Sequence, residues 1–369
     1  MTPRIVPLLS ALLLTVACDN AKTEAKKSDD GKKTAKAGAA DQAKADKADA
    51  KTGDKAEAKD GDKAEAKDGD KTDAEKAKAD EERKARMAKR FAEIDEWKAK
   101  EKTRWTDEIE SGVATLVAAE ASAADSLKAL IASPHRLPDN VERDKYRHPA
   151  ETLAFFGIEP SMTVIEVGPG WGWYTELLAP MLANKGKLVV TAFDPDGPED
   201  KGRTIYGRRF QAFSQRSEAA YGKIDLIVQG EDKDLDLGAK GEADVVFIVR
   251  GMHGWVNRDV VEANLREVNA ALKPGGTVAV VQHRAKEGAD AKETSKQGYL
   301  PQAYVVEQFE KAGFTLAEAS EINANPKDTT DHPEGVWTLP PTLALGDTDK
   351  DKYLGIGESD RMTLRFQKK

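Results

Sequence analysis

The chain has 369 residues, of which 33% are charged, and a formal net charge of −8 at neutral pH. An acidic excess argues against nonspecific DNA or RNA binding, because that binding neutralises phosphates with clustered Lys and Arg. We therefore expect a small molecule or a protein as the partner, and no nucleic acid.

Residues 1–18 predict an export signal. Arg4 precedes an apolar stretch over residues 5–16 that is too short to span a bilayer as a mature helix. The stretch ends in Leu14-Thr15-Val16-Ala17-Cys18, which resembles a bacterial lipobox, and Cys18 is the only cysteine of the chain. The resemblance implies lipidation of Cys18 and a periplasmic lipoprotein anchored to a membrane of the cell envelope. An ordinary secretory signal with an incidental thiol is the alternative.

Residues 19–84 consist of Ala, Lys, Asp, Glu and Gly with almost no large apolar side chain. Such a segment cannot bury enough surface to offset its ordering entropy, so we predict that it is disordered. The unit Gly53-Asp54-Lys55-Ala56-Glu57-Ala58-Lys59-Asp60 recurs over residues 61–68. We expect a tether that holds the following domain off a membrane.

Residues 85–133 remain rich in helix formers and acquire apolar side chains at spacings of three and four. This pattern predicts one or two amphipathic helices that dock on the following domain. A basic helix on a membrane surface is the alternative, and the interspersed Asp and Glu disfavour it.

Residues 134–369 predict one α/β domain, because short apolar runs alternate with helical segments. Five runs are expected to be parallel strands: residues 163–167, 187–193, 224–228, 244–249 and 277–282. Residues 314–319 and 362–366 would close the sheet, joined by a long excursion.

The first of these strands opens into glycines at alternate positions, in Glu166-Val167-Gly168-Pro169-Gly170-Trp171-Gly172. Such a run, followed by helix formers, predicts a strand, a tight turn and a helix N-terminus that can receive a polar ligand. A dinucleotide fingerprint would need its third glycine where the bulky Trp173 stands. The spacing therefore disfavours a pyrophosphate ligand.

The pattern Glu166-x-Gly168-x-Gly170-x-Gly172 resembles motif I of class I S-adenosylmethionine-dependent methyltransferases. Further blocks resemble predicted bacterial methyltransferases, which are largely uncharacterised and often exported: residues 135–136, 143–149, 153–157, 172–180 and 358–364. The resemblance implies a Rossmann-like sheet of seven strands whose final strand is antiparallel. It also implies that S-adenosylmethionine binds at Glu166 and the three glycines, and it names no methyl acceptor.

The second part of the ligand site is expected one strand further on. Asp194 follows the second predicted strand, where doubly wound nucleotide sites place an acid that accepts hydrogen bonds from ribose hydroxyls. Asp194 can also form a turn with Pro195 and Gly197, and the two roles are compatible. After the third strand, the resemblance implies a residue near the adenine, for which we take Asp232; a solvated loop is the alternative.

The acceptor is expected at the carboxyl ends of the fourth and fifth strands, near residues 250–255 and 282–284. Methyl transfer requires alignment of the acceptor, exclusion of water and, for a protonated acceptor, removal of a proton. His253 is the first candidate for the base, because an imidazole titrates near neutral pH. His148 is the second, because its segment can fold over the cofactor. For each, a histidine bonded to backbone in a structural turn is the alternative.

Two further alternatives concern the whole domain. Gly251 stands where the family commonly has Asn, which removes an amide able to orient an acceptor. S-adenosylmethionine is made in the cytosol, whereas the signal directs the chain out of it. A catalytically inactive lipoprotein of this fold, with a binding or structural role in the envelope, is therefore the second hypothesis. We predict no metal site, since the histidines lack the short spacings of zinc ligands and there is no second cysteine.

Overall fold

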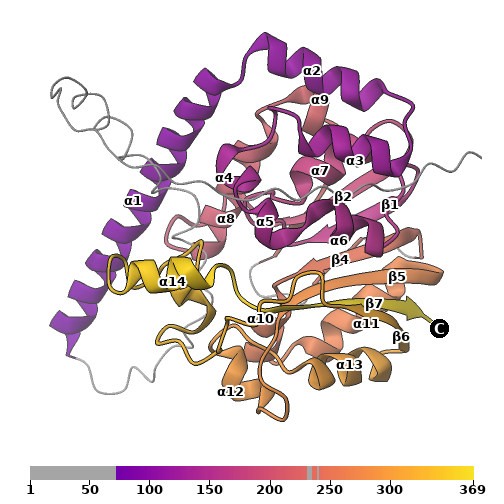
Figure 1. Cartoon of the computed structure of the whole chain (residues 1–369). Coiled ribbons are helices and arrows are strands. Elements are labelled where there is room, and N and C mark those ends of the chain that lie inside the picture. The colour runs from indigo at the N-terminus through magenta and orange to yellow at the C-terminus, as the bar shows by residue number, and fades with distance from the viewer. Residues whose placement is uncertain (1–71, 231–234, 239–240) are drawn as a thin grey trace, which may run out of the picture. The chain divides into compact units, whose positions relative to one another are not determined.

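The computed structural model describes residues 72–230, 235–238 and 241–369, which belong to the unit Asp49–Lys369 of the chain (Figure 1). Cys18, most of the predicted tether and Asp232 lie outside the described residues. Within the described part, no helix combines the length and the apolar character needed to cross a membrane.

Seven strands form one mixed sheet through the middle of this unit (Figure 1). In chain order they are β1 Thr163–Val167, β2 Lys187–Phe193, β3 Asp225–Gln229, β4 Ala243–Val249, β5 Leu272–His283, β6 Phe314–Ser320 and β7 Arg361–Lys368. Their order in the sheet is β3-β2-β1-β4-β5-β7-β6. The first five strands are parallel, and β7 is antiparallel to both of its neighbours. This arrangement confirms the class I methyltransferase sheet predicted from the sequence.

The strand boundaries differ from the prediction mainly at β5. This strand begins at Leu272 because Leu272 pairs with Ala243 of β4, ahead of a register shift. Pro274 and two glycines follow Leu272, a combination that resembles a turn in the sequence. Leu272 and Thr277 pair with β4 on either side of this stretch, and Gly275 has a positive φ of 74°, so the strand continues across an irregularity that the local turn signal marks correctly.

Helices cover both faces of the sheet (Figure 1). In chain order they are α1 Asp73–Arg104, α2 Asp107–Ala118, α3 Ala123–Ile131, α4 Pro138–Val141, α5 Asp144–Arg147, α6 Pro149–Phe155, α7 Thr175–Leu182, α8 Gly202–Ser214, α9 Glu218–Tyr221, α10 Met252–Asn257, α11 Val261–Ala271, α12 Ala291–Ser295, α13 Gln302–Lys311, the 3-10 helix η1 Gly335–Thr338 and α14 Lys350–Ile356.

Alternate side chains of the strands enter two separate cores. Val164 and Phe247 pack with the helices α3, α7 and α8 on one face. Ile165 and Val246 pack with α10, α11 and α13 on the other. Because successive side chains of a strand point to opposite faces, a central strand buried on both sides reads as a continuous apolar run.

The helical region before the domain forms α1, α2 and α3. Met87 and Ile94 of α1 are buried against Ile205 and Ala212 of α8. Helix α1 begins at Asp73, within the segment predicted as tether, because Ala, Lys and Glu are strong helix formers. Thr72 also caps it, in a reciprocal capping box with Glu75.

Buried polar contacts join the short helices before β1 to α7. The carboxylate of Glu176 accepts hydrogen bonds from the Leu137 N–H and the Asn140 amide, both at 2.9 Å. Arg216 donates to the same carboxylate at 3.2 Å. His135 Nε2 also lies 2.8 Å from the Glu176 carbonyl oxygen, so the blocks at residues 135–136 and 172–180 have a structural role.

The excursion between β6 and β7 contains η1 and α14. Asn323 holds its start, donating to the Thr152 hydroxyl at 3.1 Å and to the Thr363 hydroxyl at 3.0 Å. The excursion thereby returns to the edge of the sheet at which the parallel strands end, where Trp337 and Glu358 line a cavity.

Candidate active site

A cavity of about 360 Å³ lies at the carboxyl ends of the parallel strands. One end is lined by Gly168, Gly170 and Phe193, which follow or end β1 and β2. The other end is lined by His253 and His283, near the ends of β4 and β5. One continuous space therefore joins the predicted cofactor residues to the predicted acceptor segments.

The glycine turn has two different roles along its length. Gly168, Gly170 and Gly172 all have positive φ angles, of 64°, 57° and 76°. A Cβ on Gly168 would meet nothing within 4 Å, so this backbone faces open space in the cavity wall. A Cβ on Gly172 would lie 2.4 Å from the Phe213 ring, and Gly172 does not line the cavity. Gly168 thus forms a cradle for a ligand, whereas Gly172 allows close packing of α8.

Glu166 lies at the floor of the cavity, 4% exposed. Its carboxyl accepts a hydrogen bond from the Thr175 hydroxyl at 2.7 Å. Burial raises the pKa of Glu166 to about 7, and the Thr175 hydrogen bond opposes this rise. The motif acid therefore exchanges a proton near neutral pH, and it is held rigidly between β1 and α7.

Asp194 lies at the end of β2 but does not line the cavity. It is exposed, and its Oδ1 accepts a hydrogen bond from the Asp196 N–H at 2.9 Å, as a turn-forming Asp does. The preceding Phe193 lines the cavity, together with Tyr206. The structure thus shows the turn role of Asp194, and its ribose role remains a prediction.

Trp173, which argued against a dinucleotide, is buried in the cavity wall. Its indole N–H donates to the Asn140 carbonyl at 2.9 Å. The Arg147 guanidinium lies 4.9 Å from its ring centroid, within the range of a cation–π contact. The bulky side chain therefore fills the space that a third glycine would have left open, and it supports Arg147.

The structure separates the two histidines proposed as bases. His253 on α10 lines the cavity, with its ring 6.0 Å from Trp337 and 6.2 Å from His283. His148 joins α5 to α6 in a left-handed conformation and does not line the cavity, although its neighbour Arg147 does. Of the two candidates, only His253 lines the cavity.

His283 is a further candidate; the sequence placed it in the acceptor segment at residues 282–284 but did not propose it as a base. Its Nδ1 lies 2.5 Å from the Ser359 hydroxyl, which leaves Nε2 for the cavity that the residue lines. Burial, together with Arg250 and His253, lowers the pKa of His283 well below its ordinary value. The imidazole is therefore neutral at physiological pH, as a proton acceptor must be.

Glu358 gathers a cluster of arginines near the end of the cavity that His253 and His283 line. Its carboxylate accepts hydrogen bonds from Arg143 Nε at 2.6 Å, Arg361 Nη1 at 2.8 Å and Arg147 Nε at 3.0 Å. Burial acts to raise the pKa of Glu358, but Arg143, Arg361 and Arg250 outweigh it and hold the pKa below its ordinary value. Glu358 is thus ionised and ties three arginines together at one carboxylate.

The excursion between β6 and β7 supplies the remaining wall, with Trp337, Pro340 and Thr342. Sequence reasoning gave these residues no role. The resemblance over residues 358–364 was the available signal for Glu358 and Ser359. Among the described residues, no group of three or more His, Cys, Asp or Glu side chains is placed to hold a metal ion.

The sequence over residues 141–319 matches the family described as Methyltransferase domain. No curated protein gives a significant sequence match. This matched segment contains the glycine turn, Asp194 and both histidines proposed as bases.

Solved structures similar to the chain include a SAM-dependent methyltransferase from Aquifex aeolicus, at 16% identity and a TM-score of 0.40, covering 66% of this chain and 97% of that one. N-methyltransferase NodS from Bradyrhizobium japonicum, in complex with S-adenosyl-L-homocysteine, has 16% identity and a TM-score of 0.38, with coverages of 66% and 97%. The [4+2]-cyclase SpnF has 14% identity and a TM-score of 0.38, with coverages of 60% and 80%. The family match over residues 141–319 and the strand order, which β7 completes outside that segment, together show a methyltransferase domain of the class I fold, the kind of domain that takes S-adenosylmethionine as its methyl donor.

Proposed function

We propose that this protein transfers a methyl group from S-adenosylmethionine to a small-molecule or protein acceptor, and that it does so tethered in the cell envelope. The observation that carries the proposal is the continuous cavity from the glycine turn to His253 and His283. A protein that kept this fold without catalysis would not need a continuous cavity between the glycine turn and the two histidines. S-adenosylmethionine supplies an activated methyl group on a sulfonium.

The end formed by β1 and β2 has the features that hold the donor. Gly168 and Gly170 allow close approach of backbone to ligand. The Gly168 N–H donates to the Thr191 hydroxyl at 3.0 Å, which fixes the turn against β2. Phe193 provides an apolar surface at the end of β2. We assign the ribose contact to Asp194, whose second carboxylate oxygen has no partner within the turn, and the adenine contact to Asp232.

The other end has the features that align an acceptor and remove a proton. His253 lies on the cavity wall between His283 and Trp337. His283 is kept neutral by its buried, positively charged surroundings. We assign removal of the acceptor's proton to His253. For an acceptor that binds deeper in the cavity, the neighbouring His283 receives this proton instead. Trp337 and Tyr174 exclude water from this end.

The envelope location rests on the sequence of residues 1–18 and on the tether that follows it. Lipidation at Cys18 would hold the domain near a membrane surface. Methyl transfer there requires that the donor reach the envelope, so the proposal implies a supply of S-adenosylmethionine outside the cytosol.

Calorimetry with S-adenosylmethionine and S-adenosylhomocysteine tests the cofactor directly. The chain without residues 1–18 should bind both ligands. Asp194→Ala should weaken binding roughly 10- to 150-fold, since it removes charge-assisted hydrogen bonds to the ribose. Asp194→Asn is the matched control, because its amide oxygen retains the turn contact to the Asp196 N–H.

If Asp194 only forms the turn, Asp194→Asn should bind like the wild type, and the ribose role fails. If the wild-type chain binds neither adenosyl ligand, the methyltransferase function is wrong for this protein. The inactive lipoprotein would then be the better hypothesis.

A further inference from the structure

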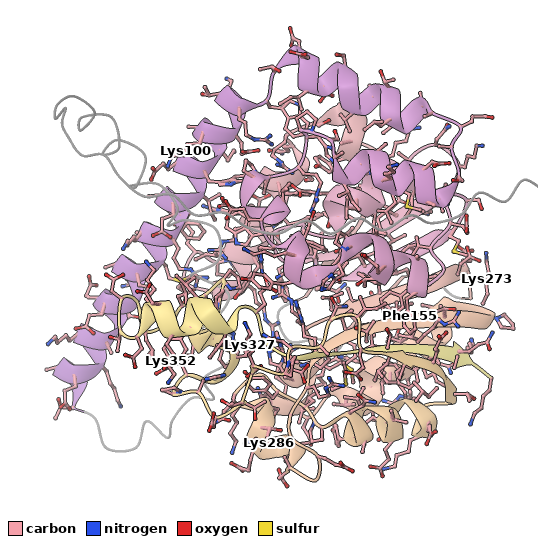
Figure 2. All side chains as sticks on the ribbon, viewed as in Figure 1. Lys100, Phe155, Lys273, Lys286, Lys327 and Lys352 are labelled. Carbon is pink, nitrogen blue, oxygen red and sulfur yellow. The ribbon has the colours of Figure 1, made fainter. Side chains whose placement is uncertain are left out.

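One face of α1 packs against the domain along much of the helix. Side chains on this face recur every three or four residues and are buried or half-buried: Met87, Arg90, Ile94, Trp97 and Glu101. Figure 2 shows Lys100, outside this face, projecting away from the domain. Helix α1 ends at Arg104, so it lies wholly outside the segment that matches the methyltransferase family.

Trp97 contacts the glycine turn from outside the cavity. Its ring centroid lies 5.4 Å from that of Trp171, which stands between Gly170 and Gly172. The Arg209 guanidinium of α8 lies 4.4 Å from the Trp171 ring centroid. At these distances aromatic rings attract each other and attract cations. Trp171 does not line the cavity, so its side chain joins the turn to α1 and α8.

The position of Trp171 limits where the adjacent cavity wall can lie. Gly170 lines the cavity and is bonded directly to Trp171. Consecutive Cα atoms lie about 3.8 Å apart, so a displacement of Trp171 displaces Gly170. Glycine has no side chain that neighbours could hold by packing. The contact between Trp97 and Trp171 therefore helps to place the backbone of the glycine turn.

A second contact of α1 supports the turn after β2. The Arg208 guanidinium lies 4.3 Å from the ring centroid of Phe91 on α1. Nε of Arg208 donates a hydrogen bond to the Pro195 carbonyl at 3.0 Å. Pro195 follows Asp194, to which we assign the ribose contact. Phe91 thus supports, through Arg208, the turn that carries Asp194.

A third contact reaches the wall formed by α8. The Arg90 guanidinium of α1 lies 6.0 Å from the ring centroid of Tyr206, which lines the cavity. On the same helix α8, Ile205 packs against the buried side chains of α1. Helix α1 therefore contacts the glycine turn, the support of the turn after β2 and the α8 wall. All three belong to the end of the cavity formed by β1 and β2.

We propose that α1 is an accessory part of the donor site, in which Trp97 is a positioning residue that holds the glycine turn in the shape that binds the donor. This inference rests on the proposed function, because it concerns binding of S-adenosylmethionine in the same cavity. Helix α1 lines no part of the cavity and acts through Trp171, Arg208 and Tyr206. Docking of a helix outside the matched segment thereby sets the affinity of the domain for its donor.

Calorimetry with S-adenosylhomocysteine, on the chain without residues 1–18, measures this effect. Trp97→Ala should weaken binding about 10-fold or more, within the usual range of coupling free energies. Trp97→Phe keeps an aromatic ring beside Trp171 and should retain most of the affinity. Trp97→Leu keeps apolar volume but loses the ring, so it should also weaken binding and replaces Trp97→Ala if that variant does not fold.

Val305→Ala is the matched control. Val305 is buried on α13, in the core on the other face of the sheet, so its truncation lowers stability without touching α1 or the glycine turn. This variant should bind S-adenosylhomocysteine like the wild type. Equal losses of affinity in Trp97→Ala and Val305→Ala would overturn the proposal, since general destabilisation would then explain both.

Hydrogen exchange of the ligand-free protein tests the turn itself. The Gly168 N–H donates to the Thr191 hydroxyl at 3.0 Å, and the Gly172 N–H donates to the Pro169 carbonyl at 2.9 Å. If Trp97 holds the turn, Trp97→Ala should speed exchange at both amides, and Val305→Ala should not. Unchanged exchange in folded Trp97→Ala would overturn the positioning role.

The two measurements separate this inference from the proposed function. If the wild type and Trp97→Ala bind S-adenosylhomocysteine equally well, α1 is not part of the donor site, and the proposed function stands. If the wild type does not bind S-adenosylhomocysteine, the proposed function fails. Exchange at Gly168 and Gly172 still decides in that case whether Trp97 positions the turn.

Discussion

Gly168 and Gly172 share a left-handed backbone conformation, but their surroundings predict losses of stability of different size for the same substitution. Gly172→Ala should lower the free energy of unfolding by about 2–4 kcal/mol, because a Cβ would combine backbone strain with a clash against the Phe213 ring. Gly168→Ala should cost only about 1–2 kcal/mol of strain, since its Cβ has open space. Urea unfolding of the two variants measures the difference.

The same pair should behave oppositely toward the cofactor. A Cβ at Gly168 enters the cavity and should weaken S-adenosylhomocysteine, whereas folded Gly172→Ala should bind it nearly as well as the wild type. Equal effects of the two variants on affinity would show that the turn does not divide its roles in this way.

Glu166 predicts a specific pH dependence of stability. Its folded pKa, about 7, lies above the ordinary value of 4.5, so folding favours the protonated carboxyl. The resulting stabilisation is fully present below about pH 4.5 and is lost as the pH rises through 7. Its full size is about 3 kcal/mol, from the shift in pKa.

Glu166→Gln should remove this dependence, because the amide stays neutral and can still accept the Thr175 hydrogen bond. Between pH 5 and pH 8, the free energy of unfolding of the ligand-free wild type should therefore fall by more than that of the variant. If the free energies of unfolding of the wild type and of Glu166→Gln change with pH in the same way, Glu166 is ionised in the folded protein throughout this range.

At the scale of elements, α1 carries the first part of the amphipathic region that the sequence predicts to dock on the domain. Ile94 is 4% exposed in its contact with α8, so Ile94→Ala should cost about 2–4 kcal/mol. Lys98→Ala, at an exposed position on the same helix, should change stability by no more than about 0.5 kcal/mol. Denaturant unfolding of both variants tests the docking, and a similar small effect of the two would contradict it.

Elements also show why the strands were predictable and the helices before the domain were less so. A strand buried on both faces must be apolar throughout, and five such runs stand out in the sequence. The start of α1 depends instead on a capping box at Thr72 and on docking against α8. Neither feature can be recognised from the amino-acid composition of residues 73–84, which is that of the predicted tether.

At the scale of the whole molecule, we propose that Cys18, which lies outside the described residues, sets the location of the domain. We predict that the mature chain begins at a diacylated Cys18 and partitions with membranes, because Cys18 ends a lipobox-like sequence. Cys18→Ser should release the protein from the membrane fraction or block its processing. Mass spectrometry that finds an unmodified mature terminus at another residue would refute lipidation, although not export.

The sequence by itself determined the class of fold and the part of the cavity wall that the glycine turn forms. Both depend on local signals: apolar runs of strand length, and glycines at alternate positions between a strand and a helix. Glu166 lies near the end of β1, and Gly168 and Gly170 follow it directly, so their spacing in the chain sets their spacing along the cavity wall. Trp173 was informative about the class of ligand because its position relative to the glycines is also set by the local sequence.

Only the tertiary structure decided which residues line the end of the cavity near β4 and β5. Arg147 and Glu358 are 211 residues apart in the chain, and nothing in the spacing of either predicts their contact. The same holds for Trp337, which the excursion between β6 and β7 brings to the cavity. His148 and Arg147 are neighbours in sequence, yet the left-handed backbone at His148 leaves only Arg147 in the cavity wall. Local patterns specify strands and turns, whereas a charge cluster assembled across the sheet exists only once the chain has folded.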